Sequence, residues 1–350
     1  MIVFLILTGL FFLTISCLYK YYSGCVDKNS SELIDVEIKE GTSGINIGTI
    51  LKEKGLIKSE VFFKVYLKFM NVKGLNAGYY QLSKNMDVDA IIKALQEVST
   101  YNPNEISITF QDGINMRKIA TIIEKNTNNT YDDVMKTQSD QEFLKELIDK
   151  YWFITDDILD SKIYYPLEGY LYPNTYNFKN KDVTPKEIFI RLLDEMDKQL
   201  EEIKGDIENN KYSVHELLTL ASVAHLEVRS KTDRPKVVSV FINRLNKKMS
   251  WGSDITTRYS VKLDDTRALT KAEYNTINDY NTRGTHLAGK MPAGPICAMT
   301  IDTIKAAVYP ESTEYLFFIS RIKTGETFFY KNESDFNRKK AELSNENNGY

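Results

Sequence analysis

Apolar and polar positions along the chain follow three patterns, each typical of a different element. Residues 2–19 (IVFLILTGLFFLTISCLY) form an unbroken apolar run without a charge. Residues 33–38 (LIDVEI) alternate apolar and polar side chains, as expected for a strand with one buried face. In residues 59–69, apolar side chains recur at steps of three and four, which predicts a helix with one apolar face. The chain therefore begins with an apolar segment and continues into a folded α+β region.

The apolar run is long enough to cross a membrane. As a helix rising about 1.5 Å per residue, its 18 residues would span most of a hydrocarbon core of roughly 30 Å. A cleaved signal peptide and a buried core helix are the alternatives, but no basic segment precedes the run and no A-x-A site follows it. We predict a transmembrane anchor over residues 1–22 and a polar tether over residues 23–32. Lys20, the only nearby charge before Asp27, leaves the orientation undetermined.

A compact α+β unit is predicted over residues 33–98. A turn at residues 39–43 follows the first strand and leads into an amphipathic helix. The helix at residues 59–69 comes next, then a strand at residues 77–82. A third helix is expected over residues 87–97, with Asp87 as its N-cap.

A larger α+β domain is predicted over residues 104–345. Its strand at 105–110, turn and helix at 116–124 repeat the opening of the first unit. This is either a weak internal repeat or a consequence of how common such units are. Charged helices follow, interrupted by an aromatic loop at residues 164–178, and a strand pair is expected within residues 315–330.

One helix of the larger domain has a clear start. Ser213 and Glu216 have the capping-box form S-x-x-E, so the helix should begin near Val214. On a helical wheel, one apolar stripe faces the core; it comprises Leu217, Ala221, Ala224 and Val228, with Leu220 beside them.

Two polar side chains, His225 and Glu227, lie at opposite edges of this stripe. A carboxyl group at such an edge is partly desolvated, which raises its pKa and keeps it protonated closer to neutral pH. A general acid needs that property. The alternative is an ordinary ion pair of Glu227 with a basic residue at the helix end, namely Arg229, Lys231 or Arg234.

Charge and composition exclude several classes of function. The 45 basic and 48 acidic residues give a net charge of -3, so the chain has no broad basic field for nucleic acid. Its three cysteines form no CxxC pair and have no histidine set at metal-ligand spacing. Neither G-x-G-x-x-G nor G-x-x-x-x-G-K-[ST] occurs, and no cofactor is implied.

Six ordered stretches resemble the motifs of one family. LEGYLYPNTY (167–176) is similar to L-E-G-F-L-F-P-D-T-Y, and LASVAHLEV (220–228) to L-A-S-I-V-E-K-E-T. VVSVFINRLNKKM (237–249) is close to the family form, and Ser253-Asp254 stands where the family has T-D-P-T. The sequences YNT and MPAGPI, at residues 280–282 and 291–296, resemble Y-N-T and L-P-P-G-P-I. On these motifs the chain resembles the YceG-like endolytic murein transglycosylases over nearly its whole length.

The resemblance implies a membrane-anchored enzyme with a LysM-like subdomain at residues 33–98 and its catalytic domain outside the cell. It would cleave the MurNAc-GlcNAc bonds of nascent peptidoglycan glycan strands, leave 1,6-anhydro-MurNAc ends and terminate strand elongation. Cell-wall synthases or division proteins are candidate partners.

Glu227 matches the second glutamate of E-K-E-T, so the resemblance makes it the single acid/base residue. Asp254, Asn281 and Glu168 are candidates for orienting the muramic residue or supporting Glu227. Each has a structural alternative, respectively a turn or helix cap, a loop hydrogen bond and a surface charge. The tyrosines of the aromatic loop fit either a sugar-stacking surface or core packing; they are Tyr164, Tyr165, Tyr170, Tyr172 and Tyr176.

The chain departs from the family pattern around this motif. His225 replaces the first glutamate of E-K-E-T, Gly252 stands where the family usually has glutamine, and Ile255 replaces a proline. Two extra residues lie between Thr282 and Gly289. His225 is a candidate substrate-binding residue that could donate a hydrogen bond to the sugar, or else a packing substitution. These departures motivate the alternative of an inactive peptidoglycan-binding scaffold, and a muramidase that leaves reducing ends is a third possibility.

Overall fold

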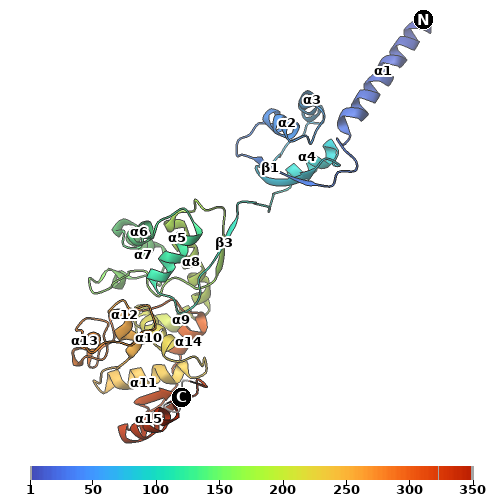
Figure 1. The fold of residues 1–350 in the computed structure, drawn as a ribbon. Helices are drawn as coiled ribbons and strands as arrows, with labels where there is room; N and C mark the ends of the chain where they lie inside the picture. The colour runs from blue at the N-terminus through green and yellow to red at the C-terminus, as the bar shows by residue number, and fades with distance from the viewer. Residues whose placement is uncertain (1, 322, 348–350) are drawn as a thin grey trace. The chain divides into compact units, whose positions relative to one another are not determined.

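The computed structural model describes residues 2–321 and 323–347, and the chain divides after Glu105 into two compact units (Figure 1). Each unit has its own hydrophobic core. Both units combine helices with short antiparallel strand pairs, so the predicted α+β class is confirmed.

The first unit closely follows the predicted order of elements. Two strands, β1 (Leu33–Ile38) and β2 (Gly78–Ser83), pair antiparallel with Val36 opposite Tyr80. The Asp87 side chain accepts a hydrogen bond from the Ala90 N–H at 2.8 Å and caps the last helix as predicted. The helices of this unit are α1 (Ile2–Ser23), α2 (Gly44–Glu53), α3 (Glu60–Phe69) and α4 (Val88–Gln96).

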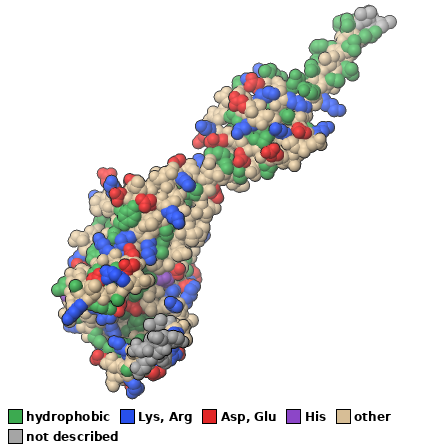
Figure 2. Space-filling view, in the orientation of Figure 1, with side chains coloured by type: hydrophobic (Ala, Val, Ile, Leu, Met, Phe, Trp, Pro, Cys, Tyr) green, Lys and Arg blue, Asp and Glu red, His purple; other side chains and the backbone are tan. Residues whose placement is uncertain are grey.

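Helix α1 exposes most of its described apolar side chains, including Phe4, Phe12 and Leu13. Figure 2 shows hydrophobic side chains along this helix. Near its C-terminal end, the Tyr22 ring stacks on Phe62 of α3 with 5.7 Å between ring centroids. Across residues 2–321 and 323–347, no helix combines the length and the apolar character needed to cross a membrane. The anchor expected over residues 1–22 is therefore not confirmed and stays a prediction.

The second unit contains two more antiparallel pairs. Strand β3 (Ile106–Thr109) pairs with β4 (Thr175–Phe178), which lies in the segment predicted to be a loop. Strands β5 (Phe317–Ser320) and β6 (Thr327–Tyr330) form the predicted C-terminal pair. This hairpin contacts α11 (Arg234–Asn246) and α15 (Glu333–Asn347), a helix that the pattern did not predict (Figure 1).

The remaining helices of the second unit surround one large core. The α-helices are α5 (Met116–Asn126), α6 (Tyr131–Thr137), α7 (Gln141–Lys150), α8 (Pro185–Leu200), α9 (Lys204–Glu208), α10 (Val214–Glu227), α12 (Asp254–Ser260), α13 (Lys271–Tyr274) and α14 (Ile301–Val308). Short 3₁₀ helices are η1 (Asp156–Leu159), η2 (Glu201–Ile203) and η3 (Thr285–Leu287).

The aromatic segment at residues 164–178, which ends in β4, packs mainly into the core. Tyr165, Tyr170, Tyr172 and Tyr176 are buried, and the partly exposed Tyr164 stacks on Tyr259 with 6.0 Å between ring centroids. Core packing, the second of the two predicted roles, therefore describes four of these five tyrosines.

Helix α10 lies at the centre of this core. It begins at Val214, as predicted, and Ser213 and Glu216 form the complete capping box. The structure buries more than the predicted stripe, since Thr219 and Ser222 on the other faces are also buried. Each hydroxyl donates to a carbonyl of its own helix, Thr219 to His215 and Ser222 to Thr219. The helix is thus enclosed by α11, α12 and α14 instead of presenting one face to water.

Candidate active site

Glu227 is the last residue of α10, where the enclosed helix reaches a groove. Its side chain is half-buried. The groove has a volume of about 580 Å³ and lies between the end of α10, the turn before α5 and the β5–β6 hairpin. Its lining residues are Asp112, Gly113, His225, Leu226, Glu227, Val228, Arg229, Arg234, Ser320, Arg321 and Gly325. The buried helix therefore presents one carboxyl group in an open hollow.

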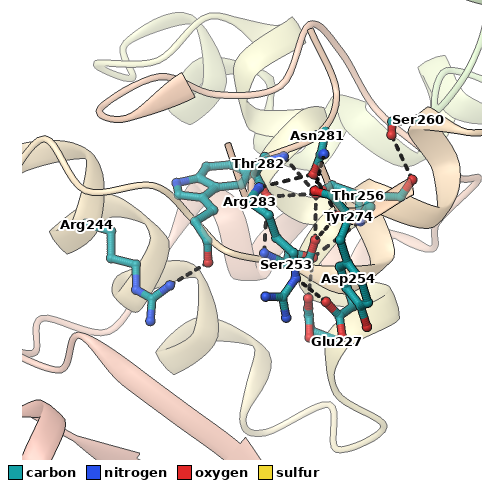
Figure 3. A network of polar contacts seen from close by, with 12 residues as sticks. Glu227, Arg244, Ser253, Asp254, Thr256, Ser260, Tyr274, Asn281, Thr282 and Arg283 are labelled. Carbon is teal, nitrogen blue, oxygen red and sulfur yellow. Dashed lines mark hydrogen bonds and ion pairs between the residues drawn. The ribbon is translucent and has the colours of Figure 1, made fainter. Parts of the chain in front are cut away.

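The Ser253 hydroxyl donates a short hydrogen bond to Glu227 Oε1 (Figure 3). Ser253 is buried and is also the N-cap of α12, because its Oγ accepts the Thr256 N–H at 3.4 Å. The Ser253 hydroxyl thus holds the Glu227 carboxyl group in place and also caps the start of α12. The sequence analysis missed Ser253, although it stands directly before the selected Asp254 in the Ser-Asp match to the family motif.

Asp254, the first residue of α12, lies beside Glu227 in Figure 3. Its carboxylate forms an ion pair with Arg283, and both side chains are partly exposed. The Arg283 guanidinium in turn lies over the Tyr274 ring, 5.0 Å from its centroid. Asp254 is therefore held in place close to Glu227 by Arg283.

Burial raises the pKa of Glu227 above the ordinary glutamate value. The hydrogen bond from Ser253 opposes this rise, the charge of Asp254 adds to it, and the cations Arg244 and Arg283 lower it. Burial outweighs the opposing contacts. Glu227 consequently holds its proton to a higher pH than an exposed glutamate, as the sequence pattern predicted for a general acid.

The expected alternative, an ion pair at the helix end, is not what the structure contains. Lys231 pairs with Asp302 at 2.9 Å. Within the described residues, neither Arg229 nor Arg234 forms an ion pair with Glu227.

Asn281 is fully buried and belongs to the polar network of Figure 3, in which Ser253 lies between it and Glu227. Its Oδ1 accepts from the Thr257 hydroxyl at 2.7 Å, and its Nδ2 donates to the carbonyls of Tyr274 and Thr276. Through these hydrogen bonds, the Asn281 side-chain amide holds residues 274–283 against α12. This position corresponds to the loop hydrogen bond named as the alternative to sugar contact.

His225 lines the same groove as Glu227 but points to different partners. Its Nδ1 lies 3.1 Å from the Thr303 hydroxyl, and its Nε2 lies 3.5 Å from the Asp112 carboxylate. Burial, together with the nearby charge of Arg234, lowers the pKa of His225 to about 4, although Asp112 opposes this. The imidazole is therefore neutral at neutral pH and forms no hydrogen bond with Glu227.

Glu168 does not line this groove. It is 2% exposed, and its two carboxyl oxygens accept the Met116 N–H at 3.1 and 3.0 Å, at the start of α5. The Tyr259 hydroxyl also donates to it, at 3.2 Å. Glu168 thus caps a helix inside the protein, and the expectation of a surface charge as its structural role was wrong.

Gly252 has a backbone geometry that explains its residue type. Its φ is +64°, in the left-handed region that glycine adopts without steric cost. Its N–H donates to the Thr282 carbonyl at 2.9 Å, and the bend places Ser253 toward Glu227. Over the described part of the chain, no group of three His, Cys, Asp or Glu side chains could hold a metal ion.

The profile of the YceG-like family matches residues 36–342, so this chain belongs to that family. It is 34% identical over 324 residues to the endolytic murein transglycosylase of Bacillus subtilis (strain 168), covering 92% of this chain and 88% of that protein. It is 30% identical over 334 residues to the endolytic murein transglycosylase of Streptococcus pneumoniae (serotype 2, strain D39), covering 91% of this chain and 60% of that protein. The resemblance drawn from the motifs is confirmed.

A solved structure is also similar. The crystal structure at 2.6 Å of a YceG-like protein from Listeria monocytogenes matches with a TM-score of 0.62 at 34% sequence identity. The match covers 89% of this chain and 99% of the Listeria chain.

The pKa of Glu168 makes stability depend on pH. Burial raises this pKa to about 7, so the folded state binds a proton that the unfolded chain releases near its ordinary value. This proton contributes at most about 3 kcal/mol to the free energy of unfolding. The contribution is fully present below the ordinary glutamate pKa and is lost as the pH rises through about 7. We expect Glu168→Gln, which keeps an acceptor for Met116, to flatten the stability profile between pH 5 and 8. Urea unfolding at several pH values measures this, and parallel profiles for the two proteins would contradict it.

Proposed function

We propose that this chain is an endolytic murein transglycosylase in which Glu227 acts first as acid and then as base. The observation that carries the proposal is a carboxyl group of raised pKa, fixed by Ser253, at the point where a buried helix opens into a groove. Two relatives that match this chain over nearly its whole length, at 34% and 30% identity, are named endolytic murein transglycosylase.

In the proposed reaction, protonated Glu227 donates to the glycosidic oxygen between N-acetylmuramic acid and N-acetylglucosamine. As that bond breaks, the carboxylate accepts the proton of the muramic 6-hydroxyl, whose oxygen bonds to C1. The proton count balances, no water is consumed, and the new end is a 1,6-anhydro sugar. The Ser253 hydrogen bond stabilises Glu227 in its carboxylate form, between the two proton transfers.

A single acid/base group suffices for this reaction, whereas common glycosidases use two carboxyl groups. The pairing of Asp254 with Arg283 supports a one-carboxyl mechanism, because that carboxylate is already engaged. Asp254 still affects catalysis through its charge, which helps to keep the proton on Glu227. We assign Asp254 and Arg283 to setting the pKa of the acid.

The cleavage chemistry has a direct test in the products. Digestion of purified glycan strands should yield 1,6-anhydro ends by mass spectrometry, and Glu227→Gln should lower the rate by at least about 100-fold because the proton donor is lost. Glu202→Gln, on an exposed side chain outside the groove, is the matched control and should cut normally. Reducing ends would identify a muramidase, and no cleavage by the native chain would favour an inactive scaffold.

The contact between Ser253 and Glu227 should be visible in the pH profile. Ser253→Ala removes a bond that lowers the pKa of Glu227, so the alkaline limb of kcat/KM should move to higher pH. The rate at the optimum should fall by up to about tenfold, the value of one hydrogen bond. Ser253→Thr keeps a hydroxyl and should restore the native profile. If the alkaline limb of Ser253→Ala stays at the native pH, this hydrogen bond does not set the pKa of Glu227.

We also propose that the enzyme works outside the cytoplasmic membrane, where its substrate lies, and that α1 attaches it to the membrane. The exposed apolar side chains of α1 support attachment, since such a surface is unfavourable in water. Fractionation of cells should recover the full chain with membranes and a chain lacking residues 1–31 without them. Equal distribution of the two chains would refute the role of α1. The LysM-like assignment of the first unit and its synthase or division partners stay predictions.

A further inference from the structure

The groove beside Glu227 carries an excess of basic side chains. Arg229, Arg234 and Arg321 line it, against the acidic Asp112 and Glu227. Arg321 is ion-paired with Glu326, so when Glu227 holds the proton for its first step, Arg229 and Arg234 face the single negative charge of Asp112. A neutral sugar chain alone does not require such a field, so the groove suits a substrate with an anionic substituent.

Arg234 is the strongest sign of a missing anionic partner. Only 6% of it is exposed, and its Nη1 donates to the Thr303 hydroxyl at 2.7 Å. Its Nε has no hydrogen-bond partner, and no acidic side chain of the described residues pairs with it. A buried guanidinium is costly unless a carboxylate or comparable acceptor compensates it.

The immediate neighbours of Arg234 do not supply that compensation. Thr303 of α14 is uncharged, and it also contacts His225 of α10. His225 is neutral at neutral pH because burial and the charge of Arg234 lower its pKa. The carboxylates of Asp112 and Asp302 act on Arg234 through their charges, but within the described residues neither forms an ion pair with it. Asp112 is half-exposed and lies 3.5 Å from His225 Nε2, and Asp302 pairs with Lys231.

Arg229 extends the basic surface toward the acid. It is exposed, lies two residues after Glu227 and makes no described ion pair. Arginine is suited to this role because its planar guanidinium binds a carboxylate through two parallel hydrogen bonds. An anion bound here would therefore lie close to the bond that Glu227 protonates.

We propose that Arg229 and Arg234 form a subsite for the carboxylate on the 3-O arm of the muramic residue at the cleaved bond. The inference rests on the proposed function, in which that sugar lies beside Glu227. The arm carries carboxylates in either of two forms, a stem peptide or, where the peptide has been removed, the lactyl group itself. Both forms present the same chemistry to a guanidinium.

Binding to defined glycan strands tests the subsite. The full chain carrying Glu227→Gln, which prevents cleavage, is titrated with stem-bearing strands, with strands stripped to the lactyl carboxylate, and with methyl-esterified samples of both. Arg229→Gln and Arg234→Gln are compared on this background with Arg338→Gln. Arg338 is an exposed arginine on α15, outside the groove, so its variant removes the same charge elsewhere.

The Arg229 and Arg234 variants should bind the charged strands about 10- to 100-fold more weakly, the value of one charged hydrogen-bond pair. They should bind esterified strands as the parent does, and Arg338→Gln should match the parent throughout. Weakening on stem-bearing strands alone identifies the peptide carboxylates as the source. Weakening on stripped strands alone identifies the lactyl carboxylate, and weakening on both shows that the subsite accepts either form.

Equal weakening on charged and esterified strands, or no weakening, overturns the subsite. Thermal unfolding checks that Arg234→Gln is folded, and the exposed Arg229 gives an independent answer if it is not. The proposed function is judged separately, by the anhydro ends that the native chain produces. Those ends could be present while the subsite fails.

Discussion

The second unit depends on the burial of α10. Nearly every side chain from His215 to Ala224 is buried, and α11, α12 and α14 enclose the helix. Such a helix cannot shift without opening the core, because protein interiors are packed as densely as organic crystals. Its last residue, Glu227, is therefore fixed in space by contacts that lie several turns away. A loop could not hold the carboxyl group as firmly.

The groups around Glu227 have opposing effects on its pKa. Ser253 donates a hydrogen bond to Glu227 and favours its carboxylate, whereas burial and Asp254 favour its protonated form. Arg283 limits the effect of Asp254 by pairing with it. In the proposed mechanism Glu227 first gives and then takes a proton. This balance suits both steps, since an extreme preference for either form would block one of them.

Local patterns predicted much of the fold. The strand Leu33–Ile38, the capping box at Ser213 and the C-terminal strand pair depend on alternation and turn chemistry that adjacent residues encode. Strand β4 was missed because its partner β3 lies about 70 residues earlier, and pairing between distant segments leaves no local signal. The full burial of α10 was also missed, because the surrounding helices decide which of its faces meet water.

The candidate site was only partly predictable for the same reason. Glu227 and Asp254 came from motif and pattern, and they lie near each other in the structure. Glu168 was selected by the same motif match, but its carboxyl group caps α5 inside the core. Ser253 and Arg283 act through contacts across 26 and 29 residues, which no spacing rule on one helix could indicate.

The raised pKa of Glu227 has a consequence for the enzyme's energy during turnover. A group that binds its proton more tightly in the folded than in the unfolded chain stabilises the fold when protonated. In the proposed cycle, the enzyme that carries the proton on Glu227 is the more stable species, and the deprotonated enzyme between the two proton transfers is the less stable one. In the proposed mechanism, each turnover takes the protein through a brief loss of stability at Glu227, and the returning proton restores it.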